Sequence, residues 1–204
     1  MIAIIDYGMG NLRSVQKAFE RLGVDAAITS DASVADRADK IVLPGVGAIA
    51  DAVAELKRTK LVDTIYKSIE IGKPFLGICL GFQALFESSE ENGGTECLGV
   101  FKGTVRRFPE NPQYVVPHMG WNDLSFKKDV PIYRGLKPTD YVYFVHSYYV
   151  DPADPEIVAT TTNYDNVDFC SSIAWNNVFA TQFHPEKSQD VGLRILKNFA
   201  ELES

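Results

Sequence analysis

The sequence contains little cysteine and no long apolar run. Its three cysteines, at positions 79, 97 and 170, are too few and too scattered for a disulfide scaffold, and their odd number leaves one over. The first apolar run, Met1–Ile5, ends at Asp6, and no stretch approaches the roughly 18 apolar residues of a membrane span. We therefore expect no signal peptide, no membrane segment and a cytoplasmic location.

Basic residues are also in deficit. Lys and Arg number 20 against 27 Asp and Glu, which gives a net charge of −7 and excludes attraction of the whole surface to nucleic acid or anionic membrane. The histidines at 118, 146 and 184 are not spaced as metal ligands. Gly8-Met9-Gly10 lacks the third glycine of a dinucleotide-binding fingerprint, because Arg13 occupies that position. The sequence thus predicts neither a metal nor a cofactor.

The composition is that of an ordinary globular protein, with 46% hydrophobic and 23% charged residues. The length of 204 residues suits a single domain, 1–204. In the first half, short apolar runs alternate with amphipathic segments. Strands are expected at 1–5, 24–28, 40–43 and 74–79, and helices at 12–22 (capped by Asn11), 47–57, 61–71 and 81–88. This alternation predicts a parallel sheet with helices on both faces.

The second half is richer in glycine, proline and β-branched residues. Strands are expected at 99–106, 141–150, 157–162, 169–175 and 178–184, and a last helix, capped by Ser188, runs to about 202. Asn176-Asn177 is a plausible hairpin turn, because asparagine tolerates positive φ. The fold class is therefore α/β, with a central, mostly parallel mixed sheet flanked by helices.

The clearest chemical signal is Gly77-Ile78-Cys79-Leu80-Gly81, between an apolar strand and a helical run. Small flanking residues permit the tight strand-to-helix turn of a nucleophile elbow. Such a turn places the Cys79 thiol at a helix N-terminus, which favours the reactive thiolate. The alternative is a buried structural cysteine. Cys170 has core surroundings and Cys97 lies in a glycine-rich loop, so neither competes.

A thiolate nucleophile needs a base. His184 ends an apolar strand, and Glu186 two residues on shares its face in extended backbone. Glu186 could therefore orient the imidazole of His184 toward the thiol, as in a catalytic triad; taken alone, the His-Pro-Glu segment could equally be a surface turn. The backbone N–H groups of Val46 and Gly47, with that of Leu80, are candidates for an oxyanion hole, although 44–47 could also be an ordinary turn.

Longer segments carry a family resemblance. They are Gly-Ile-Cys-Leu-Gly-Phe-Gln at 77–83, His-Pro-Glu-Lys-Ser at 184–188, Asp-Tyr-Gly-Met-Gly-Asn-Leu at 6–12, Pro-Gly-Val-Gly at 44–47, Pro-His-Met-Gly-Trp-Asn at 117–122 and Tyr-Phe-Val-His-Ser-Tyr at 143–148. The sequence resembles the class I, triad-type glutamine amidotransferases, which have a flavodoxin-like fold. Within them it is similar to the glutaminase subunits of imidazole glycerol phosphate synthases.

The resemblance implies that Cys79, His184 and Glu186 hydrolyse glutamine to glutamate and ammonia through a glutamyl thioester. It implies that the amino-acid end of glutamine is held by Gln83, His146, Ser147 and Tyr148. It also implies a heterodimer with a cyclase subunit, which uses the ammonia to form imidazole glycerol phosphate and aminoimidazole carboxamide ribonucleotide in histidine biosynthesis. The residues expected near that interface and the ammonia exit are Asn11, Trp121, Tyr143 and Lys187. The oxyanion donor near Val46 is expected to reorient only when the loaded partner is bound.

Three alternatives remain open at this point. The chain could be the amidotransferase subunit of another pathway, which would change its partner but not its chemistry. It could be a free-standing cysteine hydrolase acting on γ-glutamyl amides, or a flavodoxin-like binding module in which Cys79 is structural. Turnover without a partner would favour the free-standing hydrolase over an amidotransferase subunit. Activity that survives Cys79→Ala would favour the binding module.

Overall fold

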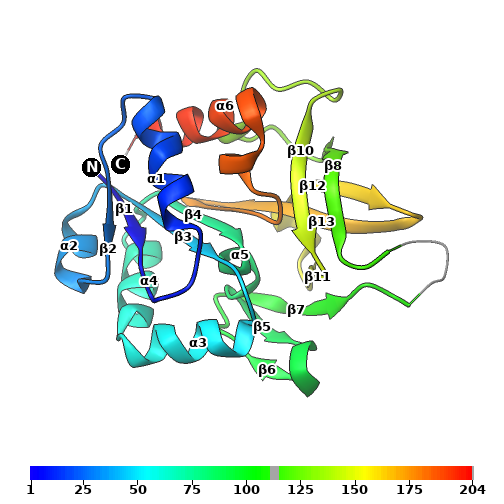
Figure 1. Ribbon diagram of the computed structural model, residues 1–204, viewed down its shortest axis with the longest axis horizontal. Helices are drawn as coiled ribbons and strands as arrows, with labels where there is room; N and C mark the ends of the chain where they lie inside the picture. Colours follow the sequence, from blue (N-terminus) through cyan, green and yellow to red (C-terminus); the bar gives the residue numbers. More distant parts are fainter. Residues whose placement is uncertain (111–114, 204) are drawn as a thin grey trace.

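The computed structural model describes residues 1–110 and 115–203 (Figure 1). One half of its main sheet is parallel, with the strand order β2-β1-β3-β4-β14. The bounds of these strands are β1 Ile2–Ile5, β2 Ala26–Thr29, β3 Lys40–Gly45, β4 Phe75–Cys79 and β14 Val178–Thr181. The predicted α/β class with a parallel core is confirmed.

The sheet continues from β14 through strands that are mainly antiparallel, in the order β13-β11-β7-β5-β6, with β12 and β9 branching from β13. Their bounds are β5 Phe86–Ser89, β6 Thr95–Glu96, β7 Phe101–Arg107, β9 Ser125–Phe126, β11 Tyr148–Pro152, β12 Val158–Tyr164 and β13 Val167–Trp175. A separate antiparallel ribbon joins β8, His118–Asp123, to β10, Tyr141–His146.

Helices cover both faces of the parallel half (Figure 1). Helices α1 (Leu12–Arg21) and α6 (Gln189–Ala200) pack on one face. Helices α2 (Ala32–Arg37), α3 (Ile49–Arg58) and α4 (Leu61–Glu70) pack on the other. Within the described ranges, none of these helices combines the length and the apolar character that crossing a membrane would require.

The two apolar cores follow from the two-residue period of the strands. In β1, Ile2 and Ile4 belong to the core beneath α1 and α6, whereas Ala3 and Ile5 belong to the core beneath α2, α3 and α4. A strand buried on both faces needs apolar side chains at every position, which explains the continuous apolar run at the start of the sequence.

The predicted helix at 81–88 is wrong. Helix α5 is a single turn, Leu80–Gln83, and the chain then enters strand β5. Phe86 is fully buried, opposite Phe101 of β7, and its ring packs edge-on against Phe82. The sheet edge offers β5 backbone partners and a buried ring position, and this tertiary pairing overrides the local helical pattern.

The predicted strand at 141–150 is in fact two strands. The chain breaks at Ser147, so that β10 pairs with β8 in the ribbon and β11 enters the main sheet. Strand β8 and helix α2 were not predicted. The hairpin at Asn176-Asn177 is confirmed, because Trp175 pairs with Val178 across it and Asn176 has a φ of 50°.

Neither predicted helix cap acts through its side chain. Asn11 precedes α1, but its amide oxygen accepts a hydrogen bond from the Ser14 hydroxyl. Ser188 precedes α6, but its hydroxyl donates to the carbonyl of His184 and accepts from the N–H of Tyr143. The Ser188 hydroxyl therefore does not cap α6. It instead links the start of this helix to Tyr143 and to His184.

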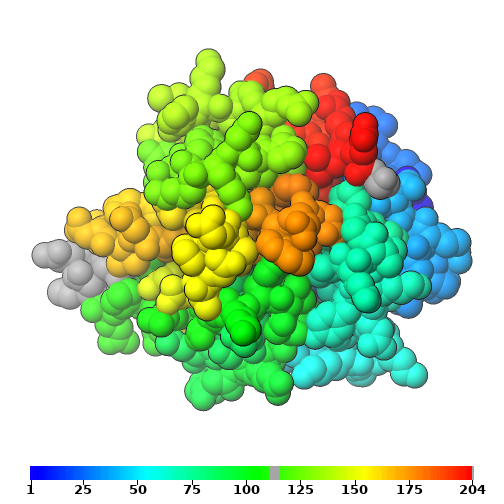
Figure 2. Space-filling view, turned by 180° about the vertical axis from the view of Figure 1, so that it is seen from behind, coloured from blue at the N-terminus to red at the C-terminus, as the bar shows by residue number. Residues whose placement is uncertain are grey.

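Seen from behind, the yellow-green segment that follows β9 lies beside the red C-terminal helix (Figure 2). Helix α6 holds this segment through side-chain bonds: Asn198 donates to the carbonyls of Ile132 and Arg134, and Arg194 donates to that of Gly135. Ile132 and Tyr133 of this segment belong to the core beneath α6, so these bonds hold the segment against that core.

Helix α5 lies so close to β3 that residue 81 has no room for a side chain. A Cβ atom on Gly81 would lie 1.9 Å from the carbonyl oxygen of Leu43, and one on Gly77 would lie 3.1 Å from the carbonyl oxygen of Gly81. The glycines flanking Cys79 are therefore required by the approach of two backbone segments, and the turn between them is fixed by packing.

The ribbon carries a buried pair of histidines. His118 and His146 face each other in register, with His118 Nδ1 2.9 Å from His146 Nε2. His146 Nδ1 lies 2.8 Å from the carbonyl of Tyr148, so this nitrogen carries the proton and Nε2 accepts from His118. Burial lowers the pKa of His118 to about 4 and that of His146 to about 3, so both rings are neutral at pH 7.

Gly81→Ala should destabilise the fold by about 3 kcal/mol, because the clash with Leu43 can be relieved only by moving α5 off the sheet. Gly23→Asn is the matched control. Its site is open and has a φ of 71°, which asparagine tolerates, so we expect a cost below about 1 kcal/mol. Urea unfolding of both variants measures the difference, and equal costs would contradict the packing argument.

The free energy of unfolding should decrease as the pH falls from about 6.5 to about 4. Over this range the histidines of the unfolded chain, whose pKa is about 6.5, bind protons, whereas the buried pair of His118 and His146 stays neutral in the folded protein. His118→Phe keeps the ring stack on Tyr164, whose centroid lies 4.0 Å away, and removes one titrating group. Urea unfolding at pH 7 and pH 5 should show a smaller acid loss for the variant. An unchanged loss would exclude His118 as its source.

Candidate active site

The ends of three adjacent strands create the site. Strands β3, β4 and β14 run parallel, so their carboxyl ends meet at one edge of the sheet, where α/β proteins bind their ligands. Cys79 ends β4 opposite Gly45 of β3, and Thr181 of β14 lies opposite Ile78. His184, three residues beyond Thr181, is thereby brought to Cys79 from 105 positions away (184 − 79).

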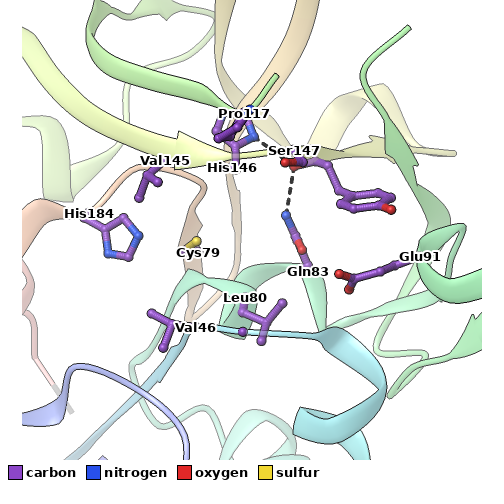
Figure 3. Close-up of a pocket in the computed structure, with 12 residues that line it drawn as sticks. Val46, Cys79, Leu80, Gln83, Glu91, Pro117, Val145, His146, Ser147 and His184 are labelled. Carbon is purple, nitrogen blue, oxygen red and sulfur yellow. Dashed lines mark hydrogen bonds between the residues drawn. The ribbon is translucent and has the colours of Figure 1, made fainter. Parts of the chain in front are cut away.

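A cavity of about 400 Å³ opens at this edge (Figure 3). In the close-up, the His184 ring lies on one side of the Cys79 sulfur, and Gln83 and Glu91 lie on the other. The described lining consists of Val46, Gly47, Cys79, Leu80, Gln83, Glu91, Pro117, Val145, His146, Ser147, Tyr148 and His184. All the residues predicted to act as nucleophile, base, oxyanion donors and substrate ligands therefore line one space.

Cys79 has a backbone conformation that is rare outside glycine, with φ 54° and ψ −108°. The residue lies between β4 and α5, and 8% of its surface is exposed. This is the strand–turn–helix geometry of the predicted nucleophile elbow. The turn directs the sulfur into the cavity while the flanking chain stays buried.

His184 lies between the Cys79 sulfur and the carboxyl group of Glu186. Its Nδ1 is 2.8 Å from Oε1 of Glu186, and both side chains are nearly inaccessible, at 3% and 2% exposure. Among the described residues, its Nε2 makes no hydrogen bond within normal distance. Burial lowers the pKa of His184, but the interactions of the ring with Cys79, followed by those with Glu186, outweigh burial and raise the pKa to about 10.

The backbone of His184 is held by the ribbon. Its N–H donates to the carbonyl of Tyr143 at 2.9 Å, and its carbonyl accepts from the Ser188 hydroxyl at 2.7 Å. The same hydroxyl accepts from the N–H of Tyr143 at 2.9 Å. Strand β10 and the short helix η4, Pro185–Lys187, are thus joined around the base.

Gln83 and Tyr148 are joined on the other side of the sulfur. The amide nitrogen of Gln83 donates to the carbonyl of Tyr148 at 2.9 Å and to the amide oxygen of Gln182 at 3.0 Å. Both ring nitrogens of His146 are already engaged, by Tyr148 and His118. The side chain of His146 therefore supports the Tyr148 carbonyl and has no free ring nitrogen to offer a ligand.

Glu91 and Tyr7 are among the residues at the site that sequence reasoning missed. Glu91 lines the cavity from the short helix η1, Glu91–Gly93, and its Oε2 accepts from the N–H of Ile49 at the start of α3. Tyr7 is buried and donates its hydroxyl to the carbonyl of Pro44 at 3.0 Å, beside the predicted oxyanion donors. Neither has a local spacing signal, because only the packing of distant segments brings them to the site.

The other cysteines differ from Cys79. Cys97 and Cys170 are buried, and desolvation raises the pKa of Cys97 to about 11 and that of Cys170 well above its ordinary value. Thiols that resist ionisation in this way are poor nucleophiles. Across residues 1–110 and 115–203, no group of side chains is arranged to bind a metal ion.

The four residues expected at a partner interface lie outside the cavity lining. Trp121 is 46% exposed, and its ring packs edge-on against Tyr143 in the ribbon, with centroids 5.9 Å apart. Asn11 is exposed at the start of α1, and Lys187 is partly buried in η4, one residue after Glu186.

The whole chain is similar to known proteins. The family model described as "Glutamine amidotransferase class-I" matches residues 3–202. Proteins named imidazole glycerol phosphate synthase subunit HisH are similar to the whole chain. The one from Syntrophotalea carbinolica is 53% identical, covering 99% of this chain and 100% of its own, and the one from Aquifex aeolicus is 54% identical, covering 96% and 94%.

Solved structures share the fold. A glutamine amidotransferase crystal structure superimposes with a TM-score of 0.75 at 19% identity, covering 99% of this chain and 100% of that one. PurLQS from Thermotoga maritima gives 0.74 at 21% identity, covering 97% and 96%. The chain belongs to the class I glutamine amidotransferases, and within them to the HisH subunits of imidazole glycerol phosphate synthase.

Proposed function

We propose that the chain hydrolyses glutamine through Cys79, His184 and Glu186 and delivers the ammonia to a cyclase subunit for histidine biosynthesis. The observation that carries the proposal is the position of the His184 ring, which is bonded to Glu186 and faces the Cys79 sulfur in the cavity at the sheet edge. The raised pKa of His184 supports a thiolate–imidazolium pair near neutral pH.

In this mechanism the Cys79 thiolate attacks the side-chain amide carbon of glutamine. His184 then donates its proton to the departing nitrogen, ammonia leaves, and a glutamyl thioester remains on Cys79. Neutral His184 next takes a proton from water, which hydrolyses the thioester to glutamate. Glu186 holds the ring through Nδ1 in both steps and stabilises the ring whenever it is charged.

Attack on the amide creates an oxyanion that needs N–H donors. The backbones of Val46, Gly47 and Leu80 border the cavity beside the sulfur. Gly47 has a φ of 95°, and Tyr7 holds the preceding Pro44 carbonyl. The Pro44 carbonyl before Val46 is therefore fixed, whereas Gly47 after it is conformationally free. This arrangement would allow the peptide group of Val46 to reorient when the partner binds.

Recognition of glutamine requires charges that match its amino-acid end. Glu91 supplies a carboxylate for the α-ammonium group, and the amide oxygen of Gln83 is a second acceptor, because its nitrogen is already committed. The backbone N–H groups at Ser147 and Tyr148 are the proposed partners of the α-carboxylate. Paired contacts at both ends reject amides that lack either charge.

The exposed face of the ribbon is the proposed docking surface for the cyclase subunit. Trp121 is exposed there beside Tyr143, and aromatic side chains of this kind dominate interface energetics. Asn11 and Lys187 are proposed to border the ammonia exit. A subunit that releases ammonia for synthesis needs an interface that keeps water away from the ammonia. Ammonia that escapes to water is protonated to ammonium, which is not a nucleophile.

Glutamate release from glutamine tests the function under three conditions: the chain alone, with the cyclase subunit, and with the cyclase subunit and its nucleotide ligand. We expect activity mainly under the third condition and none with Cys79→Ala. Full activity of the chain alone would instead identify a free-standing hydrolase. Activity that survives Cys79→Ala would remove the nucleophile from the mechanism.

Glu91→Gln should raise KM for glutamine by about tenfold or more in the complex, with a smaller change in kcat, because the ammonium group loses its charge partner. The introduced amide oxygen can still accept from Ile49, so the helix contact is kept. Glu90→Gln is the matched control, since Glu90 bonds the N–H of Arg107 outside the cavity. Equal effects of the two changes would exclude a direct contact with glutamine.

A further inference from the structure

Gln182 makes a pair of buried contacts that the proposed mechanism leaves unexplained. Its side chain is completely buried, between the end of β14 and the base His184. Its Nε2 donates to the Cys79 sulfur at 3.7 Å, a normal length for a bond to the large sulfur atom, and its Oε1 accepts from Gln83 at 3.0 Å. One carboxamide thus joins the nucleophile to a substrate-binding side chain.

The direction of these bonds is fixed. Gln83 uses both amide hydrogens, one on Gln182 and one on the carbonyl of Tyr148. That carbonyl is also bonded to His146. An amide whose two N–H groups are committed presents its oxygen elsewhere, and Gln83 lines the cavity. Gln182 therefore determines that Gln83 offers the ligand an acceptor.

Gln182 also constrains the sulfur. An N–H group donates to a thiolate more strongly than to a thiol, because bonds to a charged acceptor are the stronger ones. The donor is rigid, since the amide is buried and bonded at both ends. This contact fixes the position of the sulfur, which lies between Gln83 and the ring of His184 (Figure 3).

We propose that Gln182 is a positioning residue that sets the Cys79 thiolate and the Gln83 amide in one fixed relation, so that a bound glutamine presents its side-chain amide to the sulfur. The inference rests on the proposed glutaminase function for its consequence, but its two contacts can be tested separately. Loss of the Gln182 carboxamide should therefore lower the rate at which the Cys79 sulfur reacts with an alkylating reagent, even when no glutamine is present.

The test combines alkylation and turnover. Gln182→Met keeps the length of the side chain and removes both hydrogen bonds. We expect alkylation of Cys79 by iodoacetamide to slow by about tenfold in the chain alone, and KM for glutamine to rise by about tenfold in the complex with the cyclase subunit. Gln83→Met should raise KM and leave the alkylation rate within about twofold, because the bond from Gln182 to sulfur remains.

Thr181→Val is the matched structural control. Thr181 is equally buried, and its hydroxyl donates to the carbonyl of Phe183, away from the cavity. It should lower stability without slowing alkylation. If Gln182→Met behaves like Thr181→Val, with a lower thermal midpoint but wild-type alkylation and KM, the proposal is overturned. If alkylation slows in Gln182→Met while the wild-type complex releases no glutamate, the positioning role stands and the glutaminase function fails.

A measurement on the wild-type chain covers the case in which Gln182→Met does not fold. Alkylation of Cys79 should shift the side-chain amide proton resonances of Gln182. The amide of Asn177, which donates to the carbonyls of Ile69 and Lys73, should not move. Unchanged Gln182 resonances would show that its N–H does not contact the sulfur and would overturn the proposal.

Discussion

The close approach of helix α5 to strand β3 is the constraint on which the site depends. Gly81 sits against the carbonyl of Leu43 with no room for a Cβ atom, and Gly77 packs against Gly81 and Ala180. Between these glycines, Cys79 adopts a positive φ that costs a non-glycine residue free energy unless the surrounding structure enforces it. The packing thus directs the Cys79 sulfur from the end of the strand into the cavity, although the residue itself is largely buried.

Strand order then decides which residues meet that sulfur. Because β3 and β14 flank β4 in parallel, the loop after β3 and the segment after β14 arrive at the same edge. The ribbon completes the arrangement by bonding the backbone of His184 through Tyr143 and Ser188. The proposed substrate-binding side chains, the proposed nucleophile and the ribbon proposed as a docking surface are therefore connected through hydrogen bonds.

The three histidines illustrate how surroundings set the charge of one residue type. His184 lies between the Cys79 sulfur and the carboxyl group of Glu186, and its pKa rises to about 10 despite burial. His118 and His146 lie against each other and against aromatic rings, and burial dominates, so that their pKa values fall to about 4 and about 3. The first is suited to proton transfer, and the other two are suited to fixed hydrogen-bond geometry.

The sequence alone determined the parallel core, the elbow at Cys79 and the His184–Glu186 pair, because continuous apolar runs, small flanking residues and an i, i+2 spacing are local signals. It could not determine that the helix after Cys79 ends at Gln83, since the pairing of Phe86 with Phe101 is a tertiary contact. Nor could it locate Glu91, Tyr7 or Gln182 at the site. Their roles depend on hydrogen bonds between segments far apart in the chain, which only the packed sheet brings within reach.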